Sequence, residues 1–104
     1  MSIRRLAALI PQEYRREMLE LNMIDTAIAV EGNEPMHYLV IIWKDYIEPG
    51  FEPTCNMCRS RVLLNLRNMK KTLIELEQEY QLLTYVSTDN LKTGNNVSLN
   101  TLNQ

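Results

Sequence analysis

Histidine, cysteine and glycine are scarce in this sequence of 104 residues, which contains one His, two Cys and three Gly. These residue types build metal cages, nucleophilic triads and the glycine-rich loops that bind phosphate groups. No serine, cysteine or carboxylate stands at a spacing that would make the single histidine, His37, a catalytic base. We therefore predict that the protein is not an enzyme.

Long apolar runs are also missing. The longest covers residues 38–43, whereas crossing a bilayer takes about 18 or more such residues. The N-terminal run at residues 6–10 is shorter than the roughly 7 to 15 apolar residues of a secretory signal. The two cysteines lie only three positions apart and could not close a long loop, which excludes a secreted disulfide framework. We expect no signal peptide and no membrane contact.

Charge of one sign is not in excess either. Eleven Lys and Arg residues face thirteen Asp and Glu residues, for a formal net charge of -2, so no overall field attracts nucleic acid. The hydrophobic fraction of 45% is sufficient for one packed domain. We assign residues 1–86 to a single helical domain. Residues 87–104 form a polar tail rich in Asn, Ser and Thr, which should be disordered alone or lie extended along a neighbouring surface.

Two blocks in the first half predict a helical hairpin. Residues 12–30 place apolar side chains at three- and four-residue spacings, which is typical of one amphipathic helix. Residues 34–47 follow Asn33, a possible N-cap, and carry Pro35 in the first turn. The β-branched and aromatic content of residues 36–47 would also suit a buried strand. We favour helix over strand because the signals at the start of this block are helical.

The third block carries a heptad pattern. After Thr54, assigned here as the N-cap, apolar residues recur at spacings of 4, 3, 4, 3, 4 and 3. The mean of 3.5 keeps one helix face turned toward a partner in a coiled coil. A helix that continues to Val86 would be roughly 50 Å long, too long for two shorter helices to cover, so part of it should contact another chain. The predicted interface residues of this seam are Val62, Leu66, Met69, Leu73, Leu76, Tyr80 and Leu83.

Aromatic side chains near the second block form a second candidate contact surface. Trp43, Tyr46 and Phe51 lie close together in the sequence, and buried aromatic side chains often anchor protein interfaces. The core of a monomer would use the same three residues equally well. We include them among the predicted interface residues.

Charge along the third block is polarised. Five bases and no acid lie between Thr54 and Ile74, and the next charged residues are three glutamates, an order opposite to the preference of the helix dipole. Two antiparallel copies could pair these halves. Alternatively, residues 13–52, with nine acids and three bases, could complement the basic half within one chain. The basic half lacks aromatic stacking residues, so nucleic acid is not the expected partner, although a small nucleic-acid-binding regulator or adaptor is an alternative.

Cys55 and Cys58 form a Cys-x-x-Cys motif at the start of the predicted helix, where the helix dipole favours thiolates. Such a pair can bind zinc or exchange disulfides. Zinc needs four ligands, and His37 is the only further conventional soft ligand, so a complete site would require a carboxylate or a second subunit. Redox catalysis would need a βαβ context that is not predicted here. We favour two small packed side chains and expect no cofactor, with zinc as the alternative.

The motif also carries a family resemblance. Residues 52–63, EPTCNMCRSRVL, with Asn65, Met69 and residues 73–76, resemble small helical proteins encoded beside structural genes of crAss-like tailed bacteriophages. This resemblance implies a multi-copy virion component, such as a ring or connector protein at the head-to-tail junction. It also implies localisation in the virion or the host cytoplasm.

Together, these features predict an all-α protein: a helical hairpin plus one long C-terminal helix with a heptad seam, followed by the polar tail. The predicted role is that of a non-enzymatic structural subunit. Its expected partners are proteins, in a homo-oligomer or a multi-copy assembly.

Overall fold

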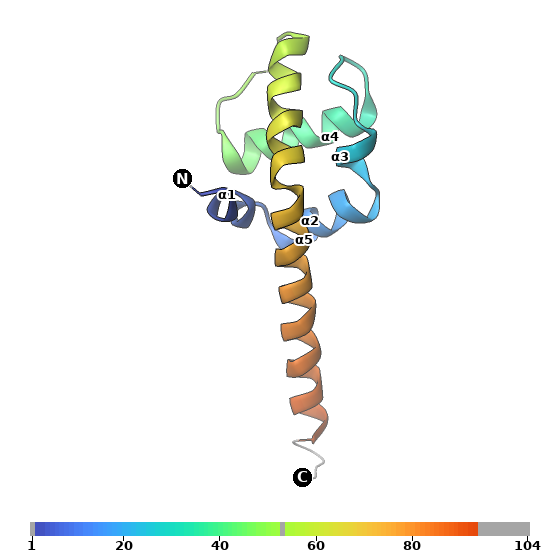
Figure 1. Cartoon of the computed structure of the whole chain (residues 1–104), viewed down its shortest axis with the longest axis vertical. Helices are drawn as coiled ribbons and strands as arrows, with labels where there is room; N and C mark the ends of the chain where they lie inside the picture. Colours follow the sequence, from blue (N-terminus) through green and yellow to red (C-terminus); the bar gives the residue numbers. More distant parts are fainter. Residues whose placement is uncertain (1, 53, 94–104) are drawn as a thin grey trace.

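The computed structural model describes residues 2–52 and 54–93, with side chains through residue 84, and within these residues it contains helices and no strand. The helices are α1 (Ile3–Leu9), α2 (Gln12–Glu20), α3 (Met23–Thr26), α4 (Glu34–Ile42), the π-helix η1 (Trp43–Ile47) and α5 (Asn56–Thr93). The shorter helices surround the first half of α5, and its second half projects beyond them (Figure 1). The prediction of an all-α fold with one long C-terminal helix is confirmed.

The first block is not one helix, and that prediction is corrected. Helix α2 ends at Glu20, and Asn22 adopts a left-handed conformation with φ of 54°, which asparagine tolerates better than most residues. The single turn α3 follows, and Ala27 then becomes extended. The break rotates the later residues away from the stripe, so that Ile28 is 58% exposed.

The second block is helical, as favoured from its end signals. The Asn33 side chain accepts a hydrogen bond from the Met36 amide at 3.0 Å and another from the Ile28 amide at 3.2 Å. It therefore caps α4 and fixes the end of the preceding loop at the same time. Pro35 lies in the first turn, where its missing N–H removes no helical hydrogen bond.

Helix α4 passes directly into η1, whose wider turn ends at the link to α5. The indole N–H of Trp43 donates to Glu48 at 2.9 Å, and Arg61 of α5 donates to the same carboxylate at 3.1 Å. These hydrogen bonds lower the pKa of Glu48, with the bond from Trp43 as the largest cause. Arg61 also stacks over the Phe51 ring at 5.1 Å. The link between η1 and α5 is thus held on α5 itself.

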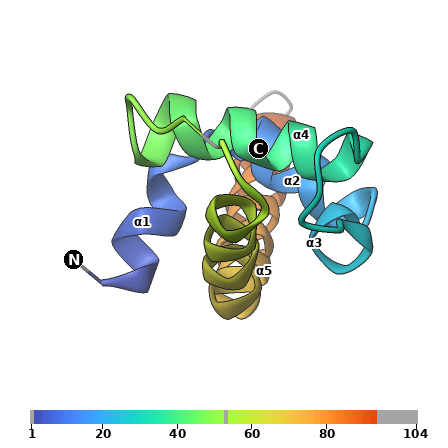
Figure 2. The ribbon, with the colours of Figure 1, turned by 90° about the horizontal axis from the view of Figure 1, so that it is seen from above.

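One hydrophobic core joins the short helices to α5. Helices α1, α2, α3 and α4 all contact α5, and in Figure 2, which looks along α5, α1 and α3 flank it while α4 crosses over it. Burial of such apolar side chains is the main source of stability for an arrangement of short helices. The largest fully buried side chains are those of Ile10, Met18, Ile24, Met36, Leu39, Val62, Leu66, Met69 and Leu73.

The ends of α5 differ from the expected ones. Helix α5 begins at Asn56, so the cap position belongs to Cys55 and not to Thr54; this prediction is corrected. At the other end the backbone stays helical to Thr93, which includes the first residues of the predicted polar tail. The rest of that tail, residues 94–104, lies outside the described residues.

Candidate functional site

The heptad seam divides into a covered and an uncovered part. The side chains of Val62, Leu66 and Leu73 are fully buried, and Met69 is 2% exposed, all of them within the core made by the chain's own helices. The seam was predicted to face another chain. In this first part it faces α1 to α4 instead, so these four side chains are not accessible to a second chain.

The uncovered part begins at Leu76, which is half-buried against the core. Tyr80 is 44% exposed and Leu83 is 68% exposed, although they continue the same face of α5. Leu82, beside the seam, is 64% exposed. Large apolar side chains at this exposure are unfavourable in water when they lie in a continuous stripe. This stripe of Leu76, Tyr80 and Leu83 is the part of the predicted interface available to another molecule.

A buried carboxylate marks the boundary between the two parts. Glu77 is only 7% exposed. The side-chain amide of Gln12, from the start of α2, donates to both Glu77 oxygens at 3.1 and 2.9 Å, and Gln81 donates at 3.4 Å. Glu77 is not among the predicted site residues, although its spacing of four from Leu73 places it on the covered side of α5. This contact fixes where the covered half of α5 ends.

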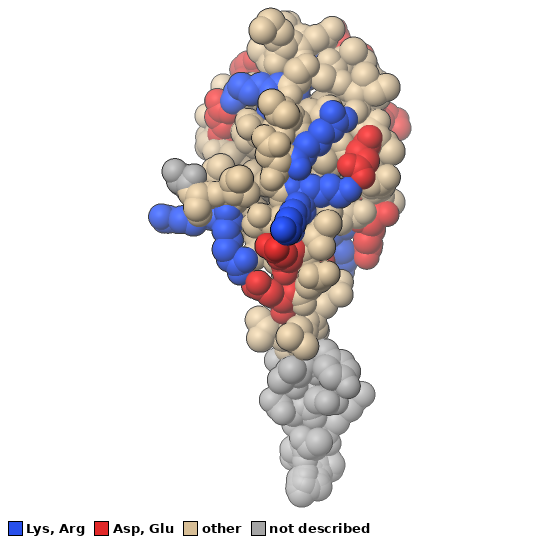
Figure 3. Space-filling model, in the orientation of Figure 1, with Lys and Arg blue, Asp and Glu red and all other residues tan. Residues whose placement is uncertain are grey.

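Two bases of the basic half of α5 pair with acids of the same chain. Lys70 pairs with Asp25 of α3, and Arg61 pairs with Glu48 at 3.1 Å. Conversely, Glu79 in the acidic half pairs with Arg4 of α1 at 2.6 Å. On the face drawn in Figure 3, basic side chains over α5 are bordered by acidic ones. The contacts of Lys70 and Arg61 fit the pairing scheme within a single chain, and pairing between antiparallel copies stays a prediction.

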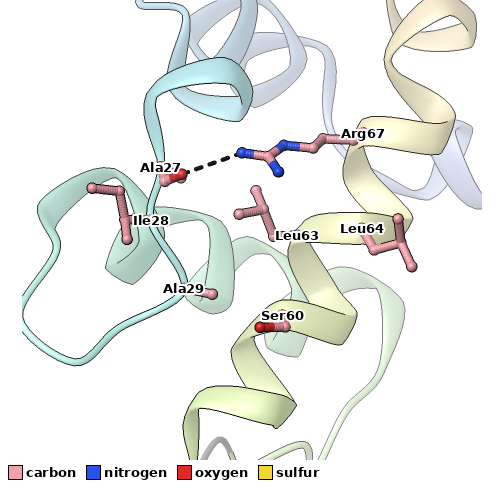
Figure 4. A pocket seen from close by; sticks show the side chains of 7 residues that line it. All are labelled: Ala27, Ile28, Ala29, Ser60, Leu63, Leu64 and Arg67. Atoms are coloured by element: carbon pink, nitrogen blue, oxygen red, sulfur yellow. Dashed lines mark hydrogen bonds between the residues drawn. The ribbon is translucent and has the colours of Figure 1, made fainter.

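A shallow groove of about 340 Å³ lies between the loop after α3 and α5. Figure 4 shows Arg67 reaching across it. The guanidinium donates to the carbonyl oxygens of Ile24 and Ala27, both at 3.4 Å. Arg67 thereby satisfies backbone oxygens at the end of α3, which lack partners inside so short a helix. The contact fixes α3 on α5, and the groove contains no pair of groups suited to acid-base chemistry.

Of the three predicted aromatic contact residues, two are buried in the core and one is half-buried. Trp43 is 4% exposed and Phe51 is 8% exposed, so both belong to the core. Tyr46 is half-buried, and its ring lies 5.6 Å from that of Tyr14. Burial, together with hydrogen bonding to Tyr14, raises the pKa of Tyr46. Of this group, only Tyr46 has a partly accessible side chain.

A second tyrosine contact links α2 to α4. The Tyr38 hydroxyl donates to Glu17 at 2.6 Å. Burial and this hydrogen bond, in that order, raise the pKa of Tyr38 well above its usual range. A tyrosine whose neutral form is favoured in this way serves as a structural hydrogen-bond donor, and a role as a base is disfavoured. The contact pins α2 to α4.

The two cysteines lie together where α5 begins. Cys55 is exposed and Cys58 is half-buried, both are free thiols, and their sulfur atoms are 2.9 Å apart. The Cys58 amide donates to the Cys55 sulfur at 3.4 Å, as an N-cap side chain does. A complete zinc site would need more ligands: within residues 2–52 and 54–93, no three His, Cys, Asp or Glu side chains form a group that could hold a metal ion.

Among the described helices, none combines the length and the apolar character that spanning a membrane requires. Compared with protein-family models, with curated proteins and with solved structures, the chain gives no match.

Proposed function

We propose that this chain is a non-enzymatic structural subunit that assembles with further copies of itself through the projecting part of α5. The observation that carries the proposal is the uninterrupted seam: Leu73 is buried by the chain's own helices, whereas Tyr80 and Leu83 continue the same face and are exposed. A heptad seam is stabilised when another helix covers it. A second copy brings the same stripe and can form a symmetric contact.

The size of the stripe suits a contact between several copies. Tyr80 and Leu83 alone present little apolar area, so one pair of helix ends would associate weakly. Several helix ends packed into a bundle bury more of each stripe. The short helices α1 to α4 and η1 form a globular head together with the first half of α5 (Figure 1). The second half of α5 projects from this head, which leaves room for other helices at the projecting end.

The finer proposal is a virion component, such as a head-to-tail connector or ring protein of a tailed bacteriophage. It is supported by the resemblance of residues 52–63 to crAss-like phage proteins. A globular head with a projecting helix also suits repeated use, because many copies can pack through one end while their heads remain outside. The corresponding location would be the virion or the host cytoplasm.

Protein partners are favoured over nucleic acid. Arg61 and Lys70 of the basic half already pair with carboxylates of their own chain. A phosphate backbone would have to displace those acids or bind beside them, which weakens the electrostatic attraction on which nucleic-acid binding depends. We therefore do not propose the nucleic-acid-binding regulator as a second function.

Light scattering of the full-length chain over a range of concentrations tests the assembly. We expect a mass above that of a monomer, and Leu83→Glu should reduce it to the monomer because a charge then lies in the seam. Leu82→Glu is the matched control, since it makes the same change at an equally exposed position one residue away, outside the seam. Leu73 is unsuitable because it lies in the head core.

The outcomes separate the proposal from its alternatives. A monomeric wild-type chain at every concentration would contradict assembly, and equal masses for Leu83→Glu and Leu82→Glu would contradict the seam as its site. Far-ultraviolet circular dichroism shows that each variant stays helical. Electron microscopy of the assembled species then tests the finer proposal: closed rings of one copy number support it, and open filaments contradict it.

A further inference from the structure

The thiol pair at the start of α5 has no part in the proposed assembly. It lies at the end of α5 opposite to the projecting part (Figure 1). Cys55 occupies the cap position, so its side chain turns back over the first turn of the helix toward Cys58. The distance of 2.9 Å between the sulfurs exceeds an S–S bond by only about 0.9 Å. Small movements of the two side chains would bring them to bonding distance.

We propose that Cys55 and Cys58 form a reversible intrachain disulfide by exchange with low-molecular-weight disulfides. This inference is independent of the proposed assembly. Cys55 is exposed and Cys58 is half-buried, which assigns different roles to the two thiols. Cys55 is the sulfur that an external reagent reaches first, and Cys58 is the sulfur that resolves the mixed disulfide.

The exchange takes place in two steps. The Cys55 thiolate attacks one sulfur of the reagent, an S–S bond forms between them, and the other half of the reagent leaves as a thiolate. The Cys58 thiolate then attacks the Cys55 sulfur and releases the second half of the reagent, also as a thiolate. In total, the protein loses two protons and two electrons, and the reagent disulfide becomes two thiols.

The local environment supports the second step. The pKa of the Cys58 thiol is lowered, mainly because Cys55 can donate a hydrogen bond to its sulfur, although partial burial opposes the effect. Cys55 has no proton to donate once it is in the mixed disulfide, but hydrogen bonds from Thr54 and from the Cys55 backbone also lower the pKa of Cys58 and remain available in the second step. Amides at the start of a helix favour a thiolate in the same way. A sulfur that ionises more readily and lies in contact with the mixed disulfide attacks it within the same chain, where no second collision is needed.

Glutathione disulfide and intact-mass spectrometry of the full-length chain test the proposal. The wild-type chain should lose the mass of two hydrogen atoms and retain no glutathione. Cys58→Ser should keep one glutathione on Cys55, because the resolving thiol is missing. Cys55→Ser should react about tenfold more slowly, because the remaining thiol is half-buried. Reduction with dithiothreitol should restore the wild-type mass.

Three outcomes would overturn the inference. The first is stable glutathione addition to the wild-type chain, and the second is a disulfide between two chains. The third is protection of both thiols until a chelator is added, which would assign the pair to a shared metal site. Circular dichroism confirms the fold of each variant. A loss of assembly in light scattering while the disulfide still forms would contradict the proposed function alone, so the two proposals fail separately.

Discussion

The two halves of α5 carry the same heptad spacing and have different surroundings. Leu66 in the first half is fully buried by helices of its own chain, whereas Leu83 in the second half is 68% exposed. Both are apolar residues on one face of one helix. The comparison shows that a seam indicates which side of a helix will be covered, and not which molecule covers it.

Alanine substitution at equivalent seam positions should produce the largest contrast. Leu66→Ala should lower the free energy of unfolding by about 3 kcal/mol, because it leaves a cavity in the core. Leu83→Ala should change it by less than about 0.5 kcal/mol in the monomer, because the side chain is already in water. Urea unfolding followed by circular dichroism at low protein concentration measures both. Equal costs would contradict the division of α5 into two halves.

The boundary between the halves can be tested at Gln12. Gln12→Ala removes the amide that donates to both oxygens of the buried Glu77. We expect a loss of about 1 to 2 kcal/mol, since one donor from Gln81 remains and a buried carboxylate requires partners. Gln78→Ala, at an exposed position one residue after Glu77, is the control. If both variants unfold at the same urea concentration, the Gln12 contact does not stabilise the boundary.

The ion pairs of the covered half should contribute less. Asp25→Asn removes the partner of Lys70 and should cost about 0.5 kcal/mol at low ionic strength, because both side chains are partly in water. This difference in unfolding free energy between Asp25→Asn and the wild type should disappear in about 0.5 M salt, because the dissolved ions screen the two charges. Asp45→Asn, an exposed acid of η1, is the matched control. A cost that persists in high salt would point to packing and not to charge.

The smallest expected effect is the contribution of Glu48 to the loss of stability at low pH. Because Trp43 and Arg61 lower the pKa of Glu48 in the folded chain, the carboxylate stabilises the fold above its ordinary pKa of 4.5. This stabilisation is lost as the pH falls from 4.5 through the lowered pKa of Glu48 in the folded chain. Trp43→Phe removes the largest cause of the shift.

The measurement is the loss of unfolding free energy between pH 7 and pH 3, determined by urea unfolding for both chains. We expect a smaller loss in Trp43→Phe than in the wild type. The packing change affects both pH values equally and cancels in this difference. An identical or larger loss in the variant would show that the indole does not stabilise the Glu48 carboxylate.

Local signals in the sequence predicted some elements correctly. The start of α4 follows from Asn33 and Pro35, because capping depends only on neighbouring residues. The phase of the α5 seam follows from its spacing for the same reason. The break after α2 could not be predicted, because Asn22 is compatible with a helix interior as well as with the left-handed turn that it adopts.

Other features depended on contacts between residues distant in the sequence. Charge order alone left pairing within one chain and pairing between copies equally open, and the packing of α3 on α5 brings Asp25 to Lys70. The predicted interface residue Trp43 became part of the core for a similar reason. Its ring is buried in the core that joins the short helices to α5, and the packing of these helices could not be predicted from the sequence.

Local patterns in the sequence were sufficient to establish that the chain is helical, that its last helix is long and that one face of this helix is apolar. The surroundings of the residues on that face depended on the packing: Val62, Leu66, Met69 and Leu73 lie in the chain's own core, whereas Tyr80 and Leu83 remain exposed. The physical reason is that helix formation and apolar periodicity are local, whereas the hydrophobic effect is non-directional and is satisfied by whichever surface the fold brings close.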